Sequence, residues 1–317
     1  MVTTRRTRRQ GRAAVLGLAL LAVGLAPGTA SAARQVAEGS TTATAACKLS
    51  LGSVTADGDH AGQDVTATSP PTTTGRQTVA EGVFPAGQAR LSSYFVVEPD
   101  TQGDDISGRT ILGDAMYNVA YETFWSGEID PDWPNRLNRV GGGWSAFTAF
   151  ESSVYETPTA SRSTQYGLRR DGVLFRWTVD SKGVWHSAGS YAGFASVKAM
   201  ALISKTSTYE TFLMNTRGGA LYTVRIPTGS PMKPVVKVVR STTWQGFESF
   251  TAQKCGQYGV LLLGIDKDTG SAFLYAVGHA NGTATVINGL GRVPGTFNDP
   301  LYFRWGVIPI LDPIYGE

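Results

Sequence analysis

The sequence is poor in the side chains that many enzymes use to bind metals or to attack substrates. It has only three histidines, His60, His186 and His279, and none lies at ligand spacing from another histidine, a cysteine or an acid. No serine lies in a Gly-x-Ser-x-Gly motif, which positions the nucleophile of many hydrolases. We therefore expect no metal, no cofactor and no catalytic residue, and we expect the histidines to be surface or packing residues.

Long hydrophobic runs are also missing after the first residues of the chain. Residues 1–32 combine a cluster of arginines, an apolar stretch at 13–26 and the small-residue site Ala30-Ser31-Ala32. This combination is typical of a secretory signal peptide, which is removed on export. We expect a secreted, extracellular protein, exported by the general or the twin-arginine route, with a flexible leader at 33–46 and one domain at 47–317.

Excess charge of either sign is absent once the signal is set aside. The chain has 28 basic and 25 acidic residues, and five of the basic ones are arginines of the signal, which leaves 23 against 25. There is no basic stripe with interleaved aromatic residues of the kind that binds nucleic acid. The sequence therefore predicts neither nucleic acid nor a membrane as a partner.

Cysteine occurs only twice, as Cys47 and Cys255. An exported protein meets an oxidising compartment, in which an even number of cysteines favours disulfide formation. We expect one disulfide between these residues, with two unpaired buried thiols as the alternative.

What the sequence does contain is an internal repeat of about 50 residues, the length of one β-propeller blade. A glycine that precedes an apolar or aromatic stretch returns five times, at Gly87, Gly143, Gly193, Gly246 and Gly295. Each of the first four is followed by a strand-like [LM]-[YF]-x-[VW] segment, which starts at Met116, Leu174, Leu221 or Leu274. Turn residues such as Arg170-Asp171-Gly172 separate further β-rich runs and indicate antiparallel hairpins.

These patterns predict an all-β fold, a five-bladed β-propeller with four-stranded antiparallel blades. Too few residues follow Gly295 to complete the fifth unit. We expect residues 64–67 and 77–80 to supply its missing strands, so that N- and C-terminal strands together close the ring and leave no open edge.

Acidic residues raise the alternative of a glycoside hydrolase, because such enzymes use paired carboxylates. The candidates lie in turn-like segments, where aspartate is favoured for local hydrogen bonding: Asp104, Asp105, Glu128, Asp130 and Asp132. We expect them to be solvated turn residues. An acid pair can still converge in space, so the hydrolase alternative stays open.

Aromatic residues beside small polar ones suit carbohydrate binding, because sugars present apolar C–H faces together with hydroxyl groups. We predict that Trp133, Asn135, Trp185 and Trp244 bind the ligand. Aromatic residues that recur at the blade period are usually core, and we assign that role to Trp144, Phe194 and Phe247.

One unit resembles the repeat of the tachylectin family of five-bladed propeller lectins. It contains Trp133-Pro134-Asn135-Arg136, then Gly142-Gly143-Trp144-Ser145-Ala146-Phe147, then Tyr166-Gly167-Leu168 and Gly172-Val173-Leu174-Phe175. The resemblance implies a propeller that binds N-acetylated amino sugars between neighbouring blades. We expect a monomeric, non-catalytic, lectin-like protein that binds amino-sugar or cell-wall glycans. The alternatives are a secreted glycoside hydrolase and a protein-binding propeller without a sugar ligand.

Overall fold

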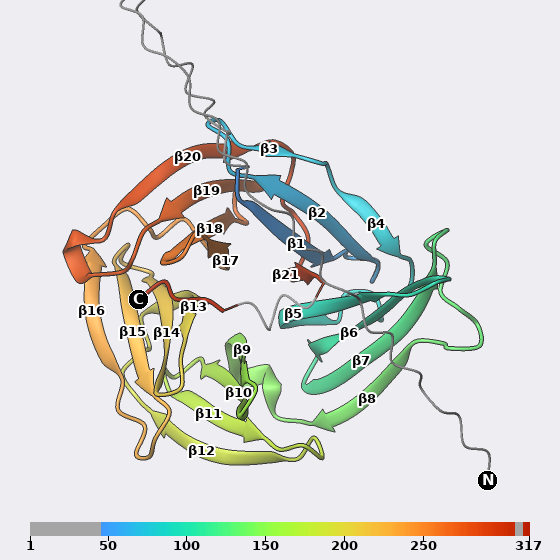
Figure 1. Ribbon diagram of the computed structural model, residues 1–317, viewed down its shortest axis with the longest axis horizontal. Coiled ribbons are helices and arrows are strands. Elements are labelled where there is room, and N and C mark those ends of the chain that lie inside the picture. The colour runs from blue at the N-terminus through green and yellow to red at the C-terminus, as the bar shows by residue number, and fades with distance from the viewer. Residues whose placement is uncertain (1–45, 308–312) are drawn as a thin grey trace, which may run out of the picture. The chain divides into compact units, whose positions relative to one another are not determined.

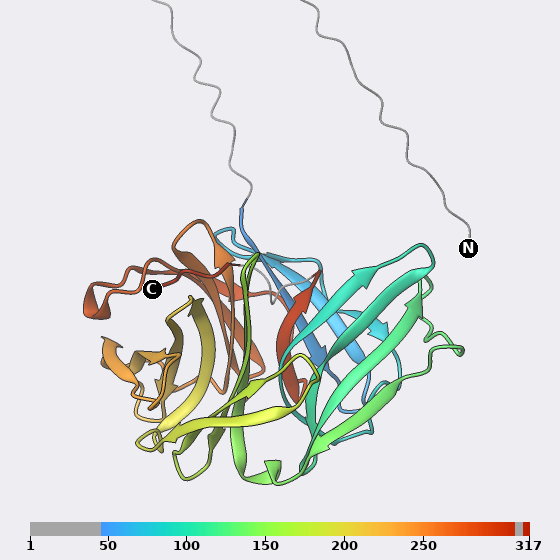
Figure 2. The ribbon, with the colours of Figure 1, turned by 60° about the horizontal axis from the view of Figure 1, so that its bottom comes forward.

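The structure is a computed structural model that describes residues 46–307 and 313–317. The expectations about the signal peptide and the leader lie outside the described residues, except at position 46. Residues 45–317 form one unit, in which antiparallel β-sheets surround a common centre like the blades of a propeller (Figures 1 and 2). The all-β prediction is confirmed, and the two short 3₁₀ helices are η1 (Trp144–Ala146) and η2 (Gly282–Ala284).

Three of the sheets have four antiparallel strands each, in chain order from the inside outwards. Their strands are β9 (Phe147–Thr157), β10 (Ala160–Arg169), β11 (Leu174–Val179) and β12 (Trp185–Tyr191); β13 (Val197–Lys205), β14 (Tyr209–Thr216), β15 (Leu221–Pro227) and β16 (Val235–Arg240); and β17 (Ser249–Cys255), β18 (Gly259–Asp266), β19 (Ser271–Val277) and β20 (Ile287–Val293).

The fourth sheet has nine strands and contains both the first strand, β1, and the last, β21. One part is β5 (Ala89–Pro99), β6 (Gly103–Leu112), β7 (Ala115–Phe124) and β8 (Arg136–Gly141). The other part is β21 (Leu301–Gly306), β1 (Lys48–Val54), β2 (His60–Thr66), β3 (Thr72–Thr73) and β4 (Gln77–Ala80). A short parallel pairing of β21 with β5, centred on Trp305 and Phe95, joins the two parts.

The burial of the side chains in a strand depends on whether that strand lies at the inner or the outer edge of its sheet. The inner strands β13 and β14 are buried along most of their length, and β14 buries polar residues such as Glu210 and Asn215 as well as apolar ones. The outermost strand β16 exposes most of its residues although it is rich in valine. Strands between two neighbouring sheets are covered on both faces and therefore read as continuous apolar runs, whereas rim strands meet solvent.

We call each four-stranded sheet, and each of the two parts of the nine-stranded sheet, a group of strands; the first group is β5–β8 and the last is β21 with β1–β4. The N- and C-terminal segments meet in the last group, as predicted. β21 pairs antiparallel with β1, and Phe303 lies opposite Gly52. A Cβ atom at Gly52 would lie 2.2 Å from the Phe303 ring, so only glycine fits there. The predicted segments 64–67 and 77–80 fall largely within β2 and β4, but the strand that contacts β21 directly is β1, which the sequence analysis did not identify.

A repeated hydrogen bond links each group of strands to the next. A buried aromatic residue just before each inner strand donates its backbone N–H to the turn between the second and third strands of the preceding group. The five bonds are Phe84 to Gly58, Trp144 to Asp114, Phe194 to Gly172, Phe297 to Gly270, all at 2.9 Å, and Trp244 to Gly219 at 3.0 Å. The repeat in the sequence is therefore a repeat of contacts between sheets.

The predicted disulfide is present. Cys47 and Cys255 are bonded with a Cα–Cα distance of 5.6 Å. Cys47 immediately precedes β1 and Cys255 ends β17. The bond therefore fastens the first described strand to the neighbouring sheet.

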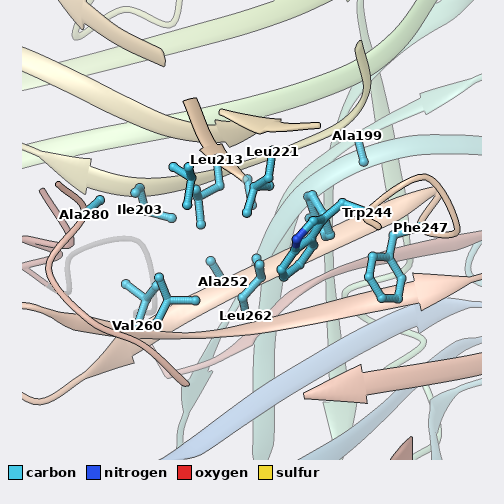
Figure 3. Packing of buried hydrophobic residues seen from close by; sticks show 14 of the residues in the cluster. Ala199, Ile203, Leu213, Leu221, Trp244, Phe247, Ala252, Val260, Leu262 and Ala280 are labelled. Carbon is cyan, nitrogen blue, oxygen red and sulfur yellow. The ribbon is translucent and has the colours of Figure 1, made fainter. Parts of the chain in front are cut away.

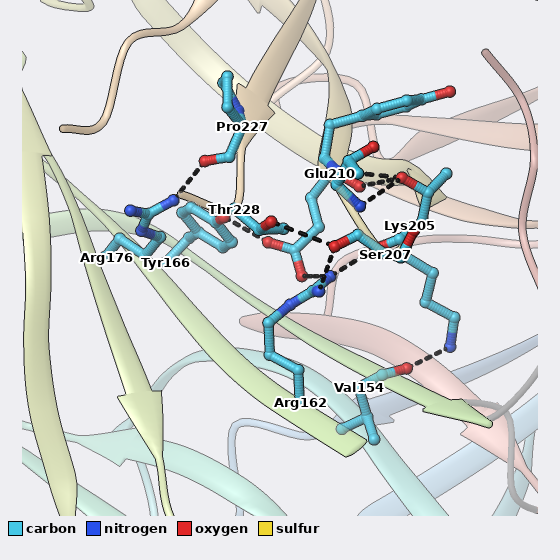
Figure 4. A network of polar contacts seen from close by, with 12 residues as sticks. Val154, Arg162, Tyr166, Arg176, Lys205, Ser207, Glu210, Pro227 and Thr228 are labelled. Atoms are coloured by element: carbon cyan, nitrogen blue, oxygen red, sulfur yellow. Dashed lines mark hydrogen bonds and ion pairs between the residues drawn. The ribbon is translucent and has the colours of Figure 1, made fainter. Parts of the chain in front are cut away.

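Apolar and polar contacts both hold adjacent sheets together. Between the sheets of β13–β16 and β17–β20, a cluster that includes Leu213, Leu262 and Trp244 is buried (Figure 3). Between the sheets of β9–β12 and β13–β16, the buried Glu210 accepts hydrogen bonds from Arg162, at 3.1 Å, and from the Tyr166 hydroxyl (Figure 4). Buried charges are tolerated when they are paired and hydrogen-bonded in this way.

Candidate functional site

A groove runs over one face of β5, β6 and β7. It consists of two adjoining hollows of about 280 and 450 Å³ that share Glu98, Ser107 and Ala120. We call it the sheet-face groove. Side chains two residues apart on a strand share a face, so the groove holds three rows of side chains that run across the strands.

The first row is acidic. In the strand register, Asp105 lies opposite Glu98 on one side and opposite Glu122 on the other. Desolvation raises the pKa of Glu122, and the nearby charge of Asp105 and a hydrogen bond with its carboxyl raise it further. Asp104 and Asp105 both lie within strand β6. The expectation that they are turn residues is therefore wrong. Three carboxylates meet on one face, and together they form a row of hydrogen-bond acceptors.

The second and third rows differ from the first in size and charge. Val96, Ser107 and Ala120 form a row of smaller side chains, which leaves room above the sheet. Beyond them, Arg109 donates a hydrogen bond of 3.0 Å to the Asn118 side chain. The groove therefore offers acceptors along one edge and a guanidinium with an amide along the other.

Residues outside the three strands border the groove. Trp133 and Arg136 line the acidic end, and the Arg136 guanidinium lies 4.6 Å from the centre of the Trp133 ring. Trp133 is 49% exposed. At the other end, Val154 and Glu156 of β9 line the groove, so this end lies between two sheets. An exposed, held aromatic ring beside several polar groups is suited to bind a sugar.

Asn135, predicted to bind the ligand, is not among the residues that line the sheet-face groove. Its amide nitrogen donates to the backbone carbonyl of Val83, and its buried Oδ1 has no partner among the described residues. Asn135 therefore fastens the loop that carries Trp133. Its role in the structure is to position Trp133, two residues before it.

Trp185 lies beside the groove, on β12. It packs against Trp177 and Trp144 at ring-centre distances of 5.9 and 6.1 Å. The Arg109 guanidinium lies 5.9 Å from its ring centre. Trp185 is half-buried, and it adjoins the polar row through Arg109.

Trp244 lies in the core between two sheets, apart from the other three predicted residues. It is 6% exposed and packs against Phe247, Phe250 and Tyr275. Trp144, also 6% exposed, makes the equivalent contacts with Phe147 and Phe150. The structural equivalent of Trp144 is thus Trp244, whereas the sequence analysis aligned Trp144 with Phe247, three residues later. A ring with no free face cannot stack on a ligand, so the structure places Trp244 as a packing residue.

Two alternating patterns in the sequence, which the sequence analysis above did not interpret, correspond to the rows of the groove. β6 contains Asp105-x-Ser107-x-Arg109, and β7 contains Asn118-x-Ala120-x-Glu122. Read in opposite directions, the two alternations match: acid beside acid, small beside small, and arginine beside asparagine. Antiparallel pairing places such matched residues side by side.

The described residues contain no group of three or more His, Cys, Asp or Glu side chains that could hold a metal ion. His60 is buried, and desolvation lowers its pKa from 6.5 to about 3. His186 pairs with Asp180 at 2.9 Å, and His279 packs against Tyr258. None of the helices in the described part of the chain is both long and apolar enough to span a bilayer.

Comparison with known proteins yields no family assignment. No protein-family model and no curated protein matches the sequence. Among solved structures, the chain is similar to the SapL1 lectin in complex with α-methyl fucoside, with 9% identity and a TM-score of 0.40 over 75% of this chain and 78% of that one.

Two further structures are similar at the same level. The fungal lectin from Aleuria aurantia, a six-bladed β-propeller that binds fucose, has 12% identity and a TM-score of 0.39 over 79% of this chain and 96% of that one. The periplasmic gluconolactonase of Pseudomonas aeruginosa has 9% identity and a TM-score of 0.37 over 78% and 96%. Similarity at this level carries no functional conclusion.

Proposed function

We propose that the protein is a secreted, non-catalytic carbohydrate-binding protein that holds a glycan in the sheet-face groove. The observation that carries the proposal is the exposed Trp133 ring beside the row of Glu98, Asp105 and Glu122. The ring offers an apolar surface for the C–H face of a sugar, and the carboxylates accept hydrogen bonds from its hydroxyls. Arg109 and Asn118 supply further polar contacts at the far end.

The predicted ligand residues take distinct roles in this proposal. Trp133 is the stacking platform, Asn135 holds its loop, and Trp185 borders the groove through Arg109. Trp244 contributes only to packing. The preferred ligands are amino-sugar or cell-wall glycans, as the resemblance of the Trp133 segment to the tachylectin repeat implies, and the protein acts as a monomer.

We also infer that the domain is a five-bladed propeller with a closed ring. Its support is the set of five equivalent aromatic-to-turn hydrogen bonds, of which the bond from Phe84 to Gly58 links the first group of strands to the last. The pairing of β1 with β21 supports the same closure. A crystal structure with another number of blades would refute it.

Export is part of the proposal, because residues 1–32 combine arginines, an apolar stretch and a small-residue site in the manner of a secretory signal peptide. The disulfide between Cys47 and Cys255 supports it, since disulfides persist mainly in oxidising compartments. Fractionation of a culture with an antibody against the domain tests this point. A protein retained in the cytoplasm contradicts it.

The convergence of carboxylates keeps glycoside hydrolysis as the second candidate. Retaining glycosidases hold their two carboxyl groups about 5 Å apart and inverting ones hold them farther apart. Asp105 and Glu122 lie opposite each other on neighbouring strands, and we favour binding over hydrolysis because the exposed Trp133 ring lies beside these acids.

The decisive experiment is a glycan array on the mature protein, followed by calorimetry with the best ligands and an assay of reducing-sugar release. The proposal expects binding without release. Asp105→Asn and Ser107→Leu should both weaken binding, the first by removing a charged acceptor and the second by filling the groove. Asp57→Asn, in the turn after β1, is a matched control outside the groove. No binding by folded protein, or release of sugar during titration, refutes the proposal.

A further inference from the structure

A second cavity, separate from the sheet-face groove, lies among the inner strands. It has a volume of about 130 Å³ and is lined by residues of β5, β9, β13, β17 and β21 and of the turn after β18. These inner strands face the common centre in Figure 1. Its charged lining residues are Arg90, Lys198, Lys267, Arg304, Glu151 and Glu248. We call it the central cavity.

The buried part of the central cavity holds an ion pair. Arg304 and Glu151 lie 3.0 Å apart, with side-chain exposures of 5% and 7%. The same guanidinium nitrogen also donates to the Ser93 hydroxyl and the Ser152 carbonyl, at 2.9 and 3.0 Å. The Nε of Arg304 is buried and has no hydrogen-bond partner among the described residues. A buried guanidinium N–H without an acceptor is costly.

Arg90 and Lys267 form no ion pair with a carboxylate among the described residues, although Glu248 and Asp299 lie near Lys267. Arg90 donates to the backbone carbonyls of Gly113, Trp144 and Phe147, at 2.8, 3.2 and 3.1 Å. Lys267 donates to the carbonyl of Pro300 at 2.5 Å. Carbonyl groups satisfy the donors but leave the formal charge in place.

The remaining charges at the central cavity form pairs. Lys198 pairs with Glu248, and Arg304 pairs with Glu151. Asp299, which lies near Lys267, is held by Arg76 at 2.9 Å. Within the described part of the chain, the cavity therefore carries two more positive than negative charges.

We propose that the central cavity binds a small oxyanion, either a free inorganic anion or the carboxylate of an acidic sugar. The anion balances the charges of Arg90 and Lys267, which both line the cavity. A cavity of about 130 Å³ holds one tetrahedral oxyanion or one carboxylate group. This site is independent of glycan binding in the sheet-face groove.

Calorimetry of the mature protein with sulfate, phosphate and glucuronate tests the proposal. We expect saturable binding at low ionic strength that weakens as salt is raised toward about 150 mM, because salt screens exposed charges. Lys267→Gln should weaken binding about fivefold or more, and Lys267→Arg should restore most of it. Lys237→Gln, an exposed position on the rim strand β16, should leave binding unchanged.

Two results overturn the proposal. One is the absence of binding by any of the three anions at low ionic strength. The other is equal affinity of the wild type and Lys267→Gln. Binding of glucuronate alone identifies the ligand as an acidic sugar, and binding of all three identifies a general oxyanion site.

A second measurement does not depend on any variant. Crystals grown with selenate should show an anomalous peak inside the central cavity, beside Arg90 and Lys267. An empty cavity beside well-ordered protein overturns the proposal.

Discussion

The backbone N–H of Phe84 lies 2.9 Å from the carbonyl oxygen of Gly58, and this bond joins the first group of strands to the last. Gly58 has a φ of +96°, a backbone conformation that other residues rarely adopt. A Cβ atom there would lie 1.9 Å from the carbonyl oxygen of Phe84. The turn and the aromatic residue can therefore meet only if the turn residue is glycine.

Gly58→Ala should lower the free energy of unfolding by roughly 2 to 4 kcal/mol, because it adds a clash to the strain of a positive φ. Gly75→Ala is the matched control. Gly75 also has a positive φ, +78°, but has open space where the Cβ would lie. It should cost only about 1 kcal/mol. Urea denaturation of both variants measures the difference, and equal losses would contradict the close-contact argument.

Acid should destabilise the protein through His60. The pKa of His60 is about 3 in the folded state, against 6.5 as its ordinary value, because burial disfavours the charged ring. The unfolded chain therefore binds a proton below pH 6.5 while the folded protein does not, and stability falls as the pH is lowered from 6.5 toward 3. The loss approaches roughly 4 to 5 kcal/mol at the lower limit.

His60→Phe isolates this effect, since the ring lies among Phe95, Phe303 and Trp305. Denaturation at pH 7 and pH 4.5 should show wild type losing about 2 to 3 kcal/mol more than the variant. Equal losses in the two proteins would mean that His60 is not the group that titrates.

The tryptophans should separate into binding and packing residues. Trp133→Ala should weaken glycan binding by roughly 1 to 3 kcal/mol and leave the melting temperature nearly unchanged, because the ring is half exposed. Trp244→Ala and Trp144→Ala should each cost about 3 to 5 kcal/mol of stability, because they leave cavities in the core. Calorimetry and thermal melts of all three distinguish these roles. Strong destabilisation by Trp133→Ala would contradict the assignment.

Removing the disulfide should destabilise the domain. The cysteines are 208 residues apart, and closing so long a loop contributes about 5 kcal/mol in the chain-entropy description. The double variant Cys47→Ser/Cys255→Ser should therefore unfold at a lower denaturant concentration than oxidised wild type. Two thiols that react with an alkylating reagent in the unreduced mature protein would show that the bond is absent.

The repeat could be predicted from the sequence because the residues that mark each unit lie close together in the chain. Aromatic residues such as Trp144 recur at the blade period where two sheets meet, and the turn residue that accepts the hydrogen bond is a glycine, such as Gly172, in four of the five contacts. β1 escaped detection because its residues, Lys48–Val54, carry none of the aromatic markers of the other units. Its place beside β21 depends on a partner far along the chain.

The candidate site was harder to predict, because it depends on strand register. Asp105 and Glu122 are separated in sequence and lie side by side only through the pairing of β6 with β7. Trp244 was misjudged for a related reason: a shift of three residues in aligning the repeats separated it from Trp144. Burial decides between a stacking role and a packing role, and burial follows from the assembled sheets.

The pairing of β1 with β21 also sets the order in which the domain can be completed. β1 emerges about 250 residues before β21 during synthesis, and until then one edge of β1 has no partner. Unpaired strand edges invite association with other chains. We expect nascent or translocating chains to need protection by chaperones, and the last strand to convert an aggregation-prone intermediate into a finished domain.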